Sequence, residues 1–511
     1  MLDAAGRTDH PARESCPRAR RFAPWERTLA PGRSAAGRGS DVSDADSDPD
    51  RGAPTGGVVE DPRLTPARKT VYATGDFTVN AVLTSLSMIY ATYFLIQVAG
   101  LRPELAGAVQ LVGRSVDAFT DPAMGRISDL ARFRLGRRRP FFLIGALPFG
   151  ATFALLWVDL GSDSQWAMFA YYTAIYVLLS LSMTVLSVPY LALQPEMALG
   201  YDARTSLNTY RNAGSVIGVF AAVGFRPAAN ALGGGAAGFA LAGVAYGIAM
   251  AIPWLLVFGV SWERPEFQRR GHQLTFREGV RVVARHRTFR QLVALYLCGR
   301  VSMDLIAAML ILYFAHCIGR GEDFEPMMLL FLTSVVLSLP VWLRISTHTD
   351  KATIFIVGSV WWMASQVVLL LAQPDWPRWT LLCFAPLAGF GYAVVDLMPW
   401  SMVGEVVDED DLATGERREG LYNGFFTFLR KLAGTVAVWL ALSLLGALGF
   451  ARDGEQSEEV VTAIRLLASI GPALFLGLGV WFARGYPLTR EAHARIVAAL
   501  AARDAARSPP P

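Results

Sequence analysis

Apolar runs about as long as a lipid bilayer is thick recur along the whole chain and leave it few possible folds. About 20 consecutive apolar residues cross the hydrocarbon core as a helix. Twelve such runs stand at residues 74–100, 104–127, 140–160, 166–197, 211–232, 236–262, 292–317, 326–345, 353–373, 379–403, 420–450 and 461–483. Because backbone polar groups cannot stay unpaired in lipid, runs of this length predict helices. The sequence therefore predicts an all-α membrane protein with twelve transmembrane helices.

The composition agrees with a membrane protein and excludes several other classes. Hydrophobic residues make up 53% of the chain and charged residues 18%, whereas soluble domains carry about 25% charged residues. The small net charge of +4 is explained by basic loops and does not indicate nucleic acid binding. The four cysteines show no metal-binding or disulfide spacing.

The twelve runs form two sets of six on either side of a polar stretch. We predict an N-terminal tail (1–68), a first six-helix bundle (69–262), a cytoplasmic central loop (263–290), a second bundle (291–486) and a cytoplasmic C-terminal tail (487–511). The two halves share a pattern, SVPYLALQPEM near the fourth run and LMPWSMVGEV near the tenth. Each has a proline, an aromatic residue and then an acid about two turns later. Repeated six-helix halves favour a transporter that rocks two bundles about a central site.

Basic loops set the predicted orientation. Arginines crowd one loop, at Arg132, Arg134, Arg137, Arg138 and Arg139, and the loops on the opposite side carry only scattered single arginines. The positive-inside rule then places both termini in the cytoplasm. The first 68 residues have almost no apolar clusters, which predicts disorder, and they lack the apolar core of a signal peptide. A regulatory tail and an unused upstream start codon are both open for this segment.

One apolar run carries a stripe of charge. Arg114, Asp117 and Asp121 are spaced i, i+3 and i+7, so they share one face of a helix. A charge facing lipid at the bilayer centre costs about 2.5–3.5 kcal/mol, so this face should meet protein or water. A coupled-ion pathway explains the stripe. The alternative is a buried Arg–Asp pair that locks two helices, although such a lock needs only one carboxylate.

Other polar residues inside the runs indicate a central cavity with a charge network. They are Asp76, Asn80, Thr184, Ser187, Arg211, Arg300, Asp304, Asp396 and Lys431. We predict that Arg300, Asp304 and Asp396, with Arg114, form a coupling network. Arg300 and Asp304 are i, i+4 and can also simply neutralise one another.

The stretch RSVDAFTDPAMGRISDLARFRLGRRRPF resembles the second-helix signature of the glycoside–pentoside–hexuronide:cation symporters, a family of the major facilitator superfamily. YATGDFTVN, VPYLALQPEM and GERREGLYNGFFTFLRK are similar to further segments of that family, so the resemblance covers most of residues 70–485. It implies the major facilitator fold, alternating access and uptake of a solute coupled to Na⁺, H⁺ or Li⁺.

The resemblance also implies a cation site. Asp117 and Asp121 match the family's cation-coordinating carboxylates, and Thr120 and Thr184 match polar neighbours of that site. Carboxylate and hydroxyl oxygens are the ligands that hard cations prefer. Two carboxylates this close also titrate as a pair, so a proton can serve in place of Na⁺.

The predicted substrate site departs from the sugar-binding pattern of the melibiose permease. The resemblance and the polar spacing together place Asp76, Asn80, Ser187, Arg211 and Lys431 in it. Asn80 and Ser187 stand where that permease has acids that hold galactosyl hydroxyls, and Leu191 stands where it has a stacking aromatic residue. A galactoside is therefore disfavoured. An anionic solute such as a uronide fits Arg211 and Lys431, and a lysophospholipid stays open.

Two loops of opposite charge predict a cytoplasmic gate. Asp129, Arg137, Arg138 and Arg139 lie in the first half, and Glu405 begins an acidic segment at the equivalent place in the second. We expect the two loops to pair when the inner gate closes and to separate when it opens.

The sequence thus predicts a secondary active transporter for Na⁺- or H⁺-coupled symport of a sugar, uronide or related small solute. The alternatives are an uncoupled facilitator or lysolipid-type transporter of the same fold and, in another class, a membrane receptor or enzyme. No nucleophile elbow or metal motif stands in the runs, so we expect no enzyme and no organic cofactor. The expected partners are the solute, the coupling cation and the lipid bilayer. We expect a monomer in the plasma (inner) membrane.

Overall fold

The computed structural model describes residues 62–84, 90–198, 201–264, 276–416, 418–451 and 456–507. The regular structure in these residues is helical, apart from one isolated bridge between Phe133 and Gly136. Most of the predicted disordered tail, residues 1–61, lies outside the described residues.

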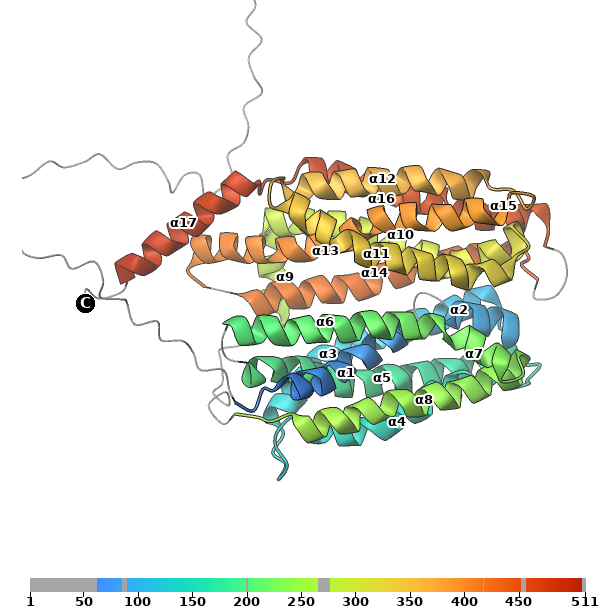
Figure 1. Ribbon diagram of the computed structural model, residues 1–511, viewed down its shortest axis with the longest axis horizontal. Helices are drawn as coiled ribbons and strands as arrows, with labels where there is room; N and C mark the ends of the chain where they lie inside the picture. Colours follow the sequence, from blue (N-terminus) through green and yellow to red (C-terminus); the bar gives the residue numbers. More distant parts are fainter. Residues whose placement is uncertain are drawn as a thin grey trace, which may run out of the picture.

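The first half (residues 62–264) and the second half (276–507) each form a bundle of long helices that run side by side (Figure 1). The first half contains α1 (Pro66–Thr84), α2 (Ala91–Tyr93), η3 (Phe94–Val98), α3 (Pro103–Leu130), α4 (Pro140–Leu156), α5 (Gln165–Met197), α6 (Tyr201–Val223), α7 (Phe225–Ala231) and α8 (Gly235–Val260). The second contains α9 (Phe276–Arg285), α10 (Arg287–Leu312), η5 (Tyr313–Cys317), η6 (Gly321–Asp323), α11 (Phe324–Ser346), α12 (Lys351–Leu371), α13 (Arg378–Thr414), α14 (Glu419–Ala447), α15 (Glu458–Ala468), α16 (Ile470–Arg484) and α17 (Arg490–Arg507).

Eight helical segments of the described chain are long and apolar enough to cross a membrane: residues 165–197, 235–260, 287–317, 321–346, 351–371, 378–414, 419–447 and 458–484. The other four predicted spans correspond to α1 with α2 and η3, to α3, to α4 and to α6. The helix α4 has 17 residues, and α3 carries the charged stripe. These helices nevertheless pack within the first bundle, α1 against α6 and α4 against α8. The all-α membrane architecture is confirmed, and the number of twelve spans stays a prediction.

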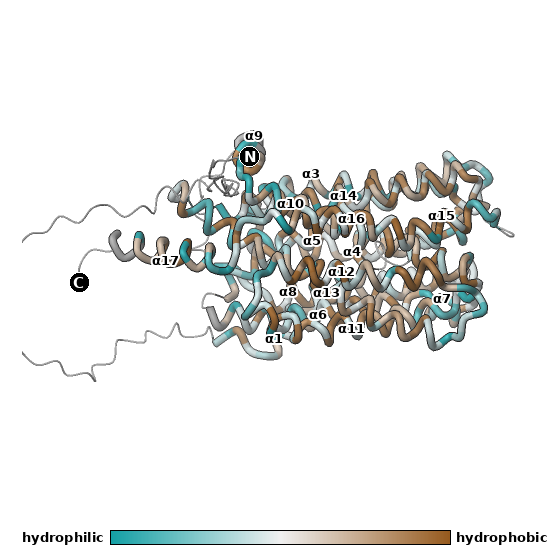
Figure 2. Tube along the Cα trace, turned by 90° about the horizontal axis from the view of Figure 1, so that it is seen from above, coloured by the Kyte–Doolittle hydropathy of each residue, from teal (hydrophilic) through white to brown (hydrophobic). Residues whose placement is uncertain are grey.

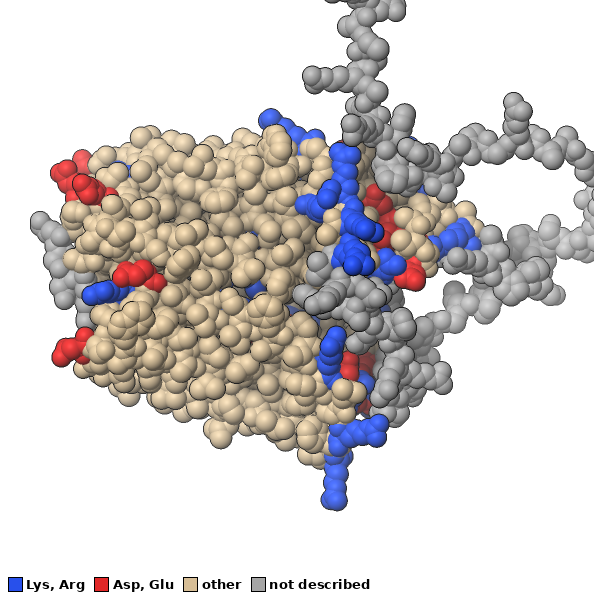
Figure 3. Space-filling model, turned by 180° about the vertical axis from the view of Figure 1, so that it is seen from behind, with Lys and Arg blue, Asp and Glu red and all other residues tan. Residues whose placement is uncertain are grey.

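Charge separates the two ends of the molecule. We call the end where α1 begins and α17 lies the tail end, and the end with α2, α7 and α15 the far end (Figure 1). Apolar residues dominate the middle of the helices (Figure 2), and lysine and arginine side chains gather at the tail end (Figure 3). This asymmetry is what the positive-inside rule requires of a cytoplasmic face, although the orientation itself stays a prediction.

Glycines let helices approach closely inside the first half. Gly214 and Gly218 on α6 are four residues apart and face Ala73 and Phe77 on α1. A β-carbon at Gly214 would lie 2.4 Å from the carbonyl oxygen of Ala73, and one at Gly218 would lie 2.2 Å from that of Phe77. Since lipid supplies no hydrophobic force between helices, this close backbone contact stabilises the pair by van der Waals packing.

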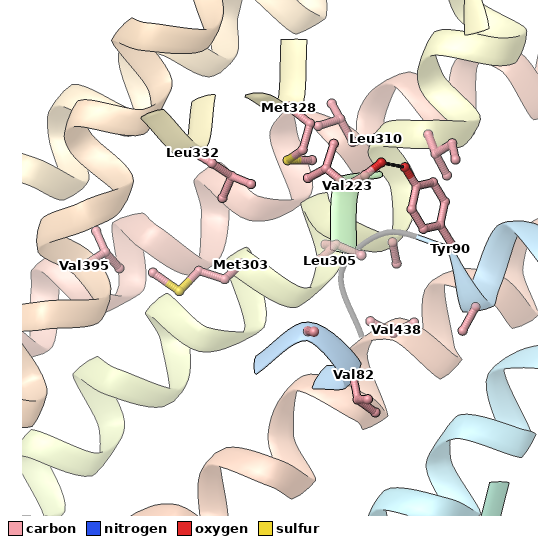
Figure 4. Close-up of a cluster of buried hydrophobic side chains, with 14 of the residues drawn as sticks. Val82, Tyr90, Val223, Met303, Leu305, Leu310, Met328, Leu332, Val395 and Val438 are labelled. Atoms are coloured by element: carbon pink, nitrogen blue, oxygen red, sulfur yellow. Dashed lines mark hydrogen bonds between the residues drawn. The ribbon is translucent and has the colours of Figure 1, made fainter. Parts of the chain in front are cut away.

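The two halves meet along α3 and α14, and α6 also contacts α11. Buried apolar side chains from both halves form a cluster at this junction (Figure 4). The labelled members are Val82, Tyr90 and Val223 from the first half, and Met303, Leu305, Leu310, Met328, Leu332, Val395 and Val438 from the second. The halves are therefore separate bundles with an apolar contact between them.

The packing of α1 against α6 predicts a sharp effect of one methyl group. In Gly218→Ala the new β-carbon meets backbone, which cannot rotate away, so the helices must separate. Overpacking of this kind lowers stability by about 1–3 kcal/mol. We expect a lower midpoint of thermal unfolding in detergent. Gly259→Ala on α8 is the control, because no atom lies within 4 Å of its β-carbon. Equal midpoints for the two variants would contradict the close contact.

Candidate functional site

A cavity of about 270 Å³ lies between the two halves. Helices α1, α3, α5 and α6 line it from the first half, and α10, α13 and α14 from the second. Its polar lining residues are Asn80, Thr84, Arg114, Asp117, Tyr176, Ser180, Arg300, Tyr392, Asp396, Arg430 and Lys431. Side chains from both halves thus converge on one small space, and many of them are charged.

The charged stripe of α3 meets Lys431 of α14 at this cavity. The Nζ of Lys431 lies 2.6 Å from Oδ2 of Asp121 and 3.3 Å from Oδ2 of Asp117. From α5, the Thr184 hydroxyl lies 2.8 Å from Oδ1 of Asp121 and 3.1 Å from Oδ1 of Asp117. We call these four residues the carboxylate centre. It joins the halves by charge, because the carboxylates and Lys431 belong to different bundles.

Two residues of the predicted sites, Thr120 and Ser187, make no hydrogen bond to the carboxylates of Asp117 and Asp121. The Thr120 hydroxyl donates to the carbonyl oxygen of Asp117 on its own helix, at 3.4 Å, rather than to a carboxylate. Ser187 is half-buried and makes no hydrogen bond within the described part of the chain. Their predicted roles in cation and substrate binding stay predictions.

Arg211 of α6 is held by Asp76 of α1. Its Nε lies 2.6 Å from Oδ2 of Asp76, and its Nη2 lies 2.9 Å from Oδ1, which is a two-pronged ion pair. Tyr190 donates to the same carboxylate at 2.6 Å, and Gln194 accepts a further hydrogen bond from Arg211. Asn80, one turn along α1, donates to the Asp76 carbonyl oxygen at 2.9 Å. Of the five residues predicted to bind substrate, Asn80 and Lys431 line this cavity, whereas Asp76, Ser187 and Arg211 do not.

The predicted coupling network centres on Asp304 of α10. Arg300 binds its carboxylate through both Nε, at 3.0 Å, and Nη2. Arg114 reaches Asp304 from the other half, with its Nη1 at 3.8 Å from Oδ2 and 3.5 Å from the Thr435 hydroxyl. A β-carbon at Gly434 would lie 1.7 Å from Asp304 Oδ2, so this glycine makes room for the carboxylate. The acidic contact of Arg114 is therefore with Asp304, which it shares with Arg300, rather than with the carboxylates of its own stripe.

The residues of the predicted cytoplasmic gate bond within their own halves. Arg138 contacts Asp129 at 2.7 Å and Glu196 at 2.6 Å, and Arg137 contacts Glu196 at 2.7 Å. Glu263 accepts hydrogen bonds from the backbone N–H groups of residues 137–139. In the second half, Glu405 pairs with Lys351 at 2.7 Å. The pairing of the two loops when the inner gate closes stays a prediction, since no ion pair joins the described residues of one loop to those of the other.

Glu263 is a residue that the sequence alone did not single out, and Glu196 stood out only as the acid of the repeated SVPYLALQPEM pattern, without a partner. Each lies far along the chain from the arginine loop, Glu196 by 59 positions from Arg137 and Glu263 by 126. The repeated pattern marked Glu196, and both acids stand at the ends of apolar runs, where lipid headgroups or basic loops lie. That signal does not name a partner.

A second set of contacts between the halves lies at the far end. Arg226 contacts Glu325, with Nη1 at 3.3 Å from Oε1, and the Tyr90 hydroxyl lies 3.5 Å from the same oxygen. Gln97 and His316 are joined at 2.9 Å. Tyr90 also belongs to the apolar cluster, which extends to Val82 at the cavity (Figure 4). Polar contacts and apolar packing thus hold the halves together on the far side of the cavity.

The described residues contain no group of three or more His, Cys, Asp or Glu side chains that is suited to a metal ion. Two carboxylates with a hydroxyl make a smaller donor set. Such a set of oxygen ligands suits a hard cation or a proton rather than a soft transition metal.

Comparisons with known proteins agree with this arrangement. The sequence profile described as MFS/sugar transport protein matches residues 71–490. The chain belongs to this major facilitator family. It is 30% identical to an uncharacterized symporter of Synechocystis sp., with 85% of this chain and 96% of that protein covered. A sodium-dependent lysophosphatidylcholine symporter of Danio rerio is 25% identical, with 84% of this chain and 87% of that protein covered.

Solved structures of major facilitator transporters share the fold. A mutant of the nucleoside transporter NupG superposes with a TM-score of 0.60 at 13% identity, covering 82% of this chain and 98% of that one. A D-xylose–proton symporter gives 0.58 at 14% identity, covering 81% and 95%. The predicted family is confirmed. This protein is an integral membrane transporter and not an enzyme.

The bonding of Arg211 predicts that Asp76 is needed for stability. Removing one partner of a buried ion pair lowers stability by about 3–5 kcal/mol, since the other charge stays buried alone. We expect Asp76→Asn to lower the thermal midpoint in detergent. The double variant Asp76→Asn with Arg211→Gln should recover part of the loss, because neither charge is then unpaired. An Asp76→Asn protein as stable as the parent would instead favour a substrate-binding role for Asp76.

Proposed function

We propose that this transporter is a cation-coupled symporter that binds Na⁺ or H⁺ at the carboxylate centre. The observation that carries the proposal is the position of Lys431, whose ammonium group is shared between Asp117 and Asp121 across the two halves. A coupling cation bound by the same oxygens takes over the role of the ammonium group. Lys431 is then released, and the contact between α3 and α14 changes.

The chemistry of the site suits this exchange. Asp117, Asp121 and the Thr184 hydroxyl offer only oxygen ligands, which hard cations prefer. A proton on either carboxylate also weakens the attraction for Lys431, because one of the two negative charges is lost. Both ions therefore compete with Lys431 for the same charge, and each couples ion entry to a contact between the halves.

The relatives support symport, and one solute is named in their descriptions. Proteins from Danio rerio and Mus musculus are described as sodium-dependent symporters of lysophosphatidylcholine. A cavity of about 270 Å³ lies just below the range of about 300–1,000 Å³ found for drug-sized ligands. The size of the cavity favours a small solute such as a sugar or uronide over a lysolipid. An uncoupled facilitator is the alternative if the carboxylate centre is structural.

We also propose how access alternates. The far end is held by Arg226 with Glu325 and by the apolar cluster, whereas the loops of the predicted tail-end gate bond within their own halves. This combination suits a state open toward the tail end. The basic loops place that end on the cytoplasmic side of the membrane, which we propose is the plasma membrane. The proposal includes twelve transmembrane helices, with both termini in the cytoplasm.

The carboxylate centre predicts a specific failure. Asp117→Asn or Asp121→Asn should abolish accumulation of solute against its gradient in proteoliposomes, while exchange of solute at equal concentrations persists. The reason is that each substitution removes a ligand of the cation but leaves the cavity for the solute in place. Asp163→Asn removes the same charge from an exposed residue without a described contact and serves as control. Unimpaired accumulation by either site variant would refute the proposed coupling role.

The far-end contact predicts the direction of a conformational shift. Arg226→Gln should favour opening at the far end, because Glu325 loses its positively charged partner from the other half and keeps only the Tyr90 hydroxyl. The measurement is labelling of Ser180→Cys, a cavity residue, by an impermeant thiol reagent added on the far side, with Cys383 replaced by serine. We expect faster labelling than in the parent background. Arg102→Gln, an exposed far-end residue, is the control, and unchanged labelling in Arg226→Gln would oppose the gating role.

A further inference from the structure

Arg430 is the lining cation of the cavity that has no carboxylate partner within the described chain. Lys431 is held by Asp117 and Asp121, and both Arg114 and Arg300 are held by Asp304. Arg430 instead lies over the ring of Trp400, with its guanidinium carbon 5.9 Å from the ring centroid. A guanidinium beside an aromatic face and open to a cavity still has its hydrogen-bond donors available to a ligand.

The aromatic residues behind Arg430 fix its position. Trp400 packs edge-on against Phe426 at 5.0 Å between ring centroids, and Phe426 stacks on Tyr296 at 4.2 Å. Phe426 and Tyr296 are buried. A rigid group of this kind holds the arginine in place before a ligand arrives, so little side-chain entropy is lost on binding.

Charge counting shows what the cavity lacks once the cation is bound. Among the described residues that line the cavity or pair with its lining, the cations are Arg114, Arg300, Arg430 and Lys431, and the carboxylates are Asp117, Asp121, Asp304 and Asp396. The two sets balance. Arg211 and Asp76 neutralise each other separately. A coupling cation, whether Na⁺ or H⁺, therefore leaves one positive charge in excess in a space of low dielectric constant.

We propose that Arg430 is the anion-binding residue of this transporter and that its solute is a monoanion carrying a carboxylate or phosphodiester group. The planar guanidinium matches both groups through two parallel hydrogen bonds. Apolar lining residues, among them Leu179, Met183 and Val219, accept the remainder of the solute. The proposal rests on the cation coupling inferred above, because the excess charge appears only when the cation is bound.

The consequence is reciprocal binding. The cation raises the affinity for the anion, and the anion raises the affinity for the cation, since each cancels the charge that the other adds. The pair crosses the membrane with no net charge. A neutral solute would leave the excess charge in the cavity and would bind more weakly.

The test uses the full chain in proteoliposomes with matched probes. Uronates, monocarboxylates and glycerophosphodiesters are each paired with a neutral counterpart, as D-glucuronate is with D-glucose. Comparing uptake of the carboxylates with uptake of the phosphodiesters shows which of the two anionic groups the transporter binds. We expect cation-dependent uptake of at least one anion and not of its neutral counterpart. Uptake of both members alike, or of no anion in the panel, would overturn the proposal.

Variants of Arg430 then locate the anion. Arg430→Gln should weaken affinity for the transported anion by about 10- to 100-fold, the usual effect of losing hydrogen bonds to a charged group. Arg430→Lys keeps the positive charge but loses the planar group that donates two parallel hydrogen bonds, so it should retain part of the affinity. Arg484→Gln removes the same charge at an exposed position at the end of α16 and should leave affinity unchanged. Equal affinities in Arg430→Gln and the parent would overturn the assignment.

A measurement on the parent protein needs no variant. An inside-negative potential, set with potassium and valinomycin, should leave the initial rate of anion uptake unchanged, because cation and monoanion cross together without net charge. Acceleration by the potential would show that positive charge moves, and the inference would fail. If the cation stimulates anionic and neutral uptake equally, only this inference fails. If the cation stimulates no uptake, the proposed symport fails as well.

Discussion

Lys431 of α14 lies between Asp117 and Asp121 of α3 and joins the two halves by charge. Two carboxylates one turn apart on α3 repel each other in a medium of low dielectric constant, and no cation on that helix lies between them. The ammonium group from α14 supplies the missing charge at 2.6 and 3.3 Å. Since the three residues come from different halves, the same electrostatic need that stabilises the stripe also fastens the two bundles together. In the proposed coupling, an ion that binds these carboxylates weakens this contact between the bundles.

The charged contacts fall into two groups according to whether they cross between the halves. Those within a half join Arg211 to Asp76, Arg300 to Asp304, Arg138 to Glu196 and Lys351 to Glu405. They move with their bundle and survive a rocking motion. Those that cross join Lys431 to Asp121, Arg114 to Asp304 and Arg226 to Glu325. Only these must break or form when one bundle moves against the other, so the first group gives rigidity and the second can set the conformation.

Sequence reasoning succeeded where a single helix contains the information. The spacing of Asp117 and Asp121 placed both on one face, and the structure shows them facing Thr184 and Lys431. It was less informative where partners lie in different helices. Arg211 was predicted to contact a substrate, which stays a prediction, and the structure adds that it pairs with Asp76, 135 positions earlier. Arg430 was overlooked because Lys431 beside it fits the family pattern, and only the packing of α14 shows which of the two neighbours has an acidic partner.

The helical membrane architecture, the family and the charged stripe could be predicted from the order of the residues alone. Each of these follows from local hydropathy, from spacing along one helix or from a contiguous motif, and none requires knowledge of a distant residue. The packing of the helices was needed to show which charge neutralises which. It also shows that Asp76 and Arg211 do not line the cavity and that Glu325 contacts Arg226 at the far end. Pairing in a low-dielectric interior depends on distances of a few ångströms between helices, and the order of residues along the chain does not specify those distances.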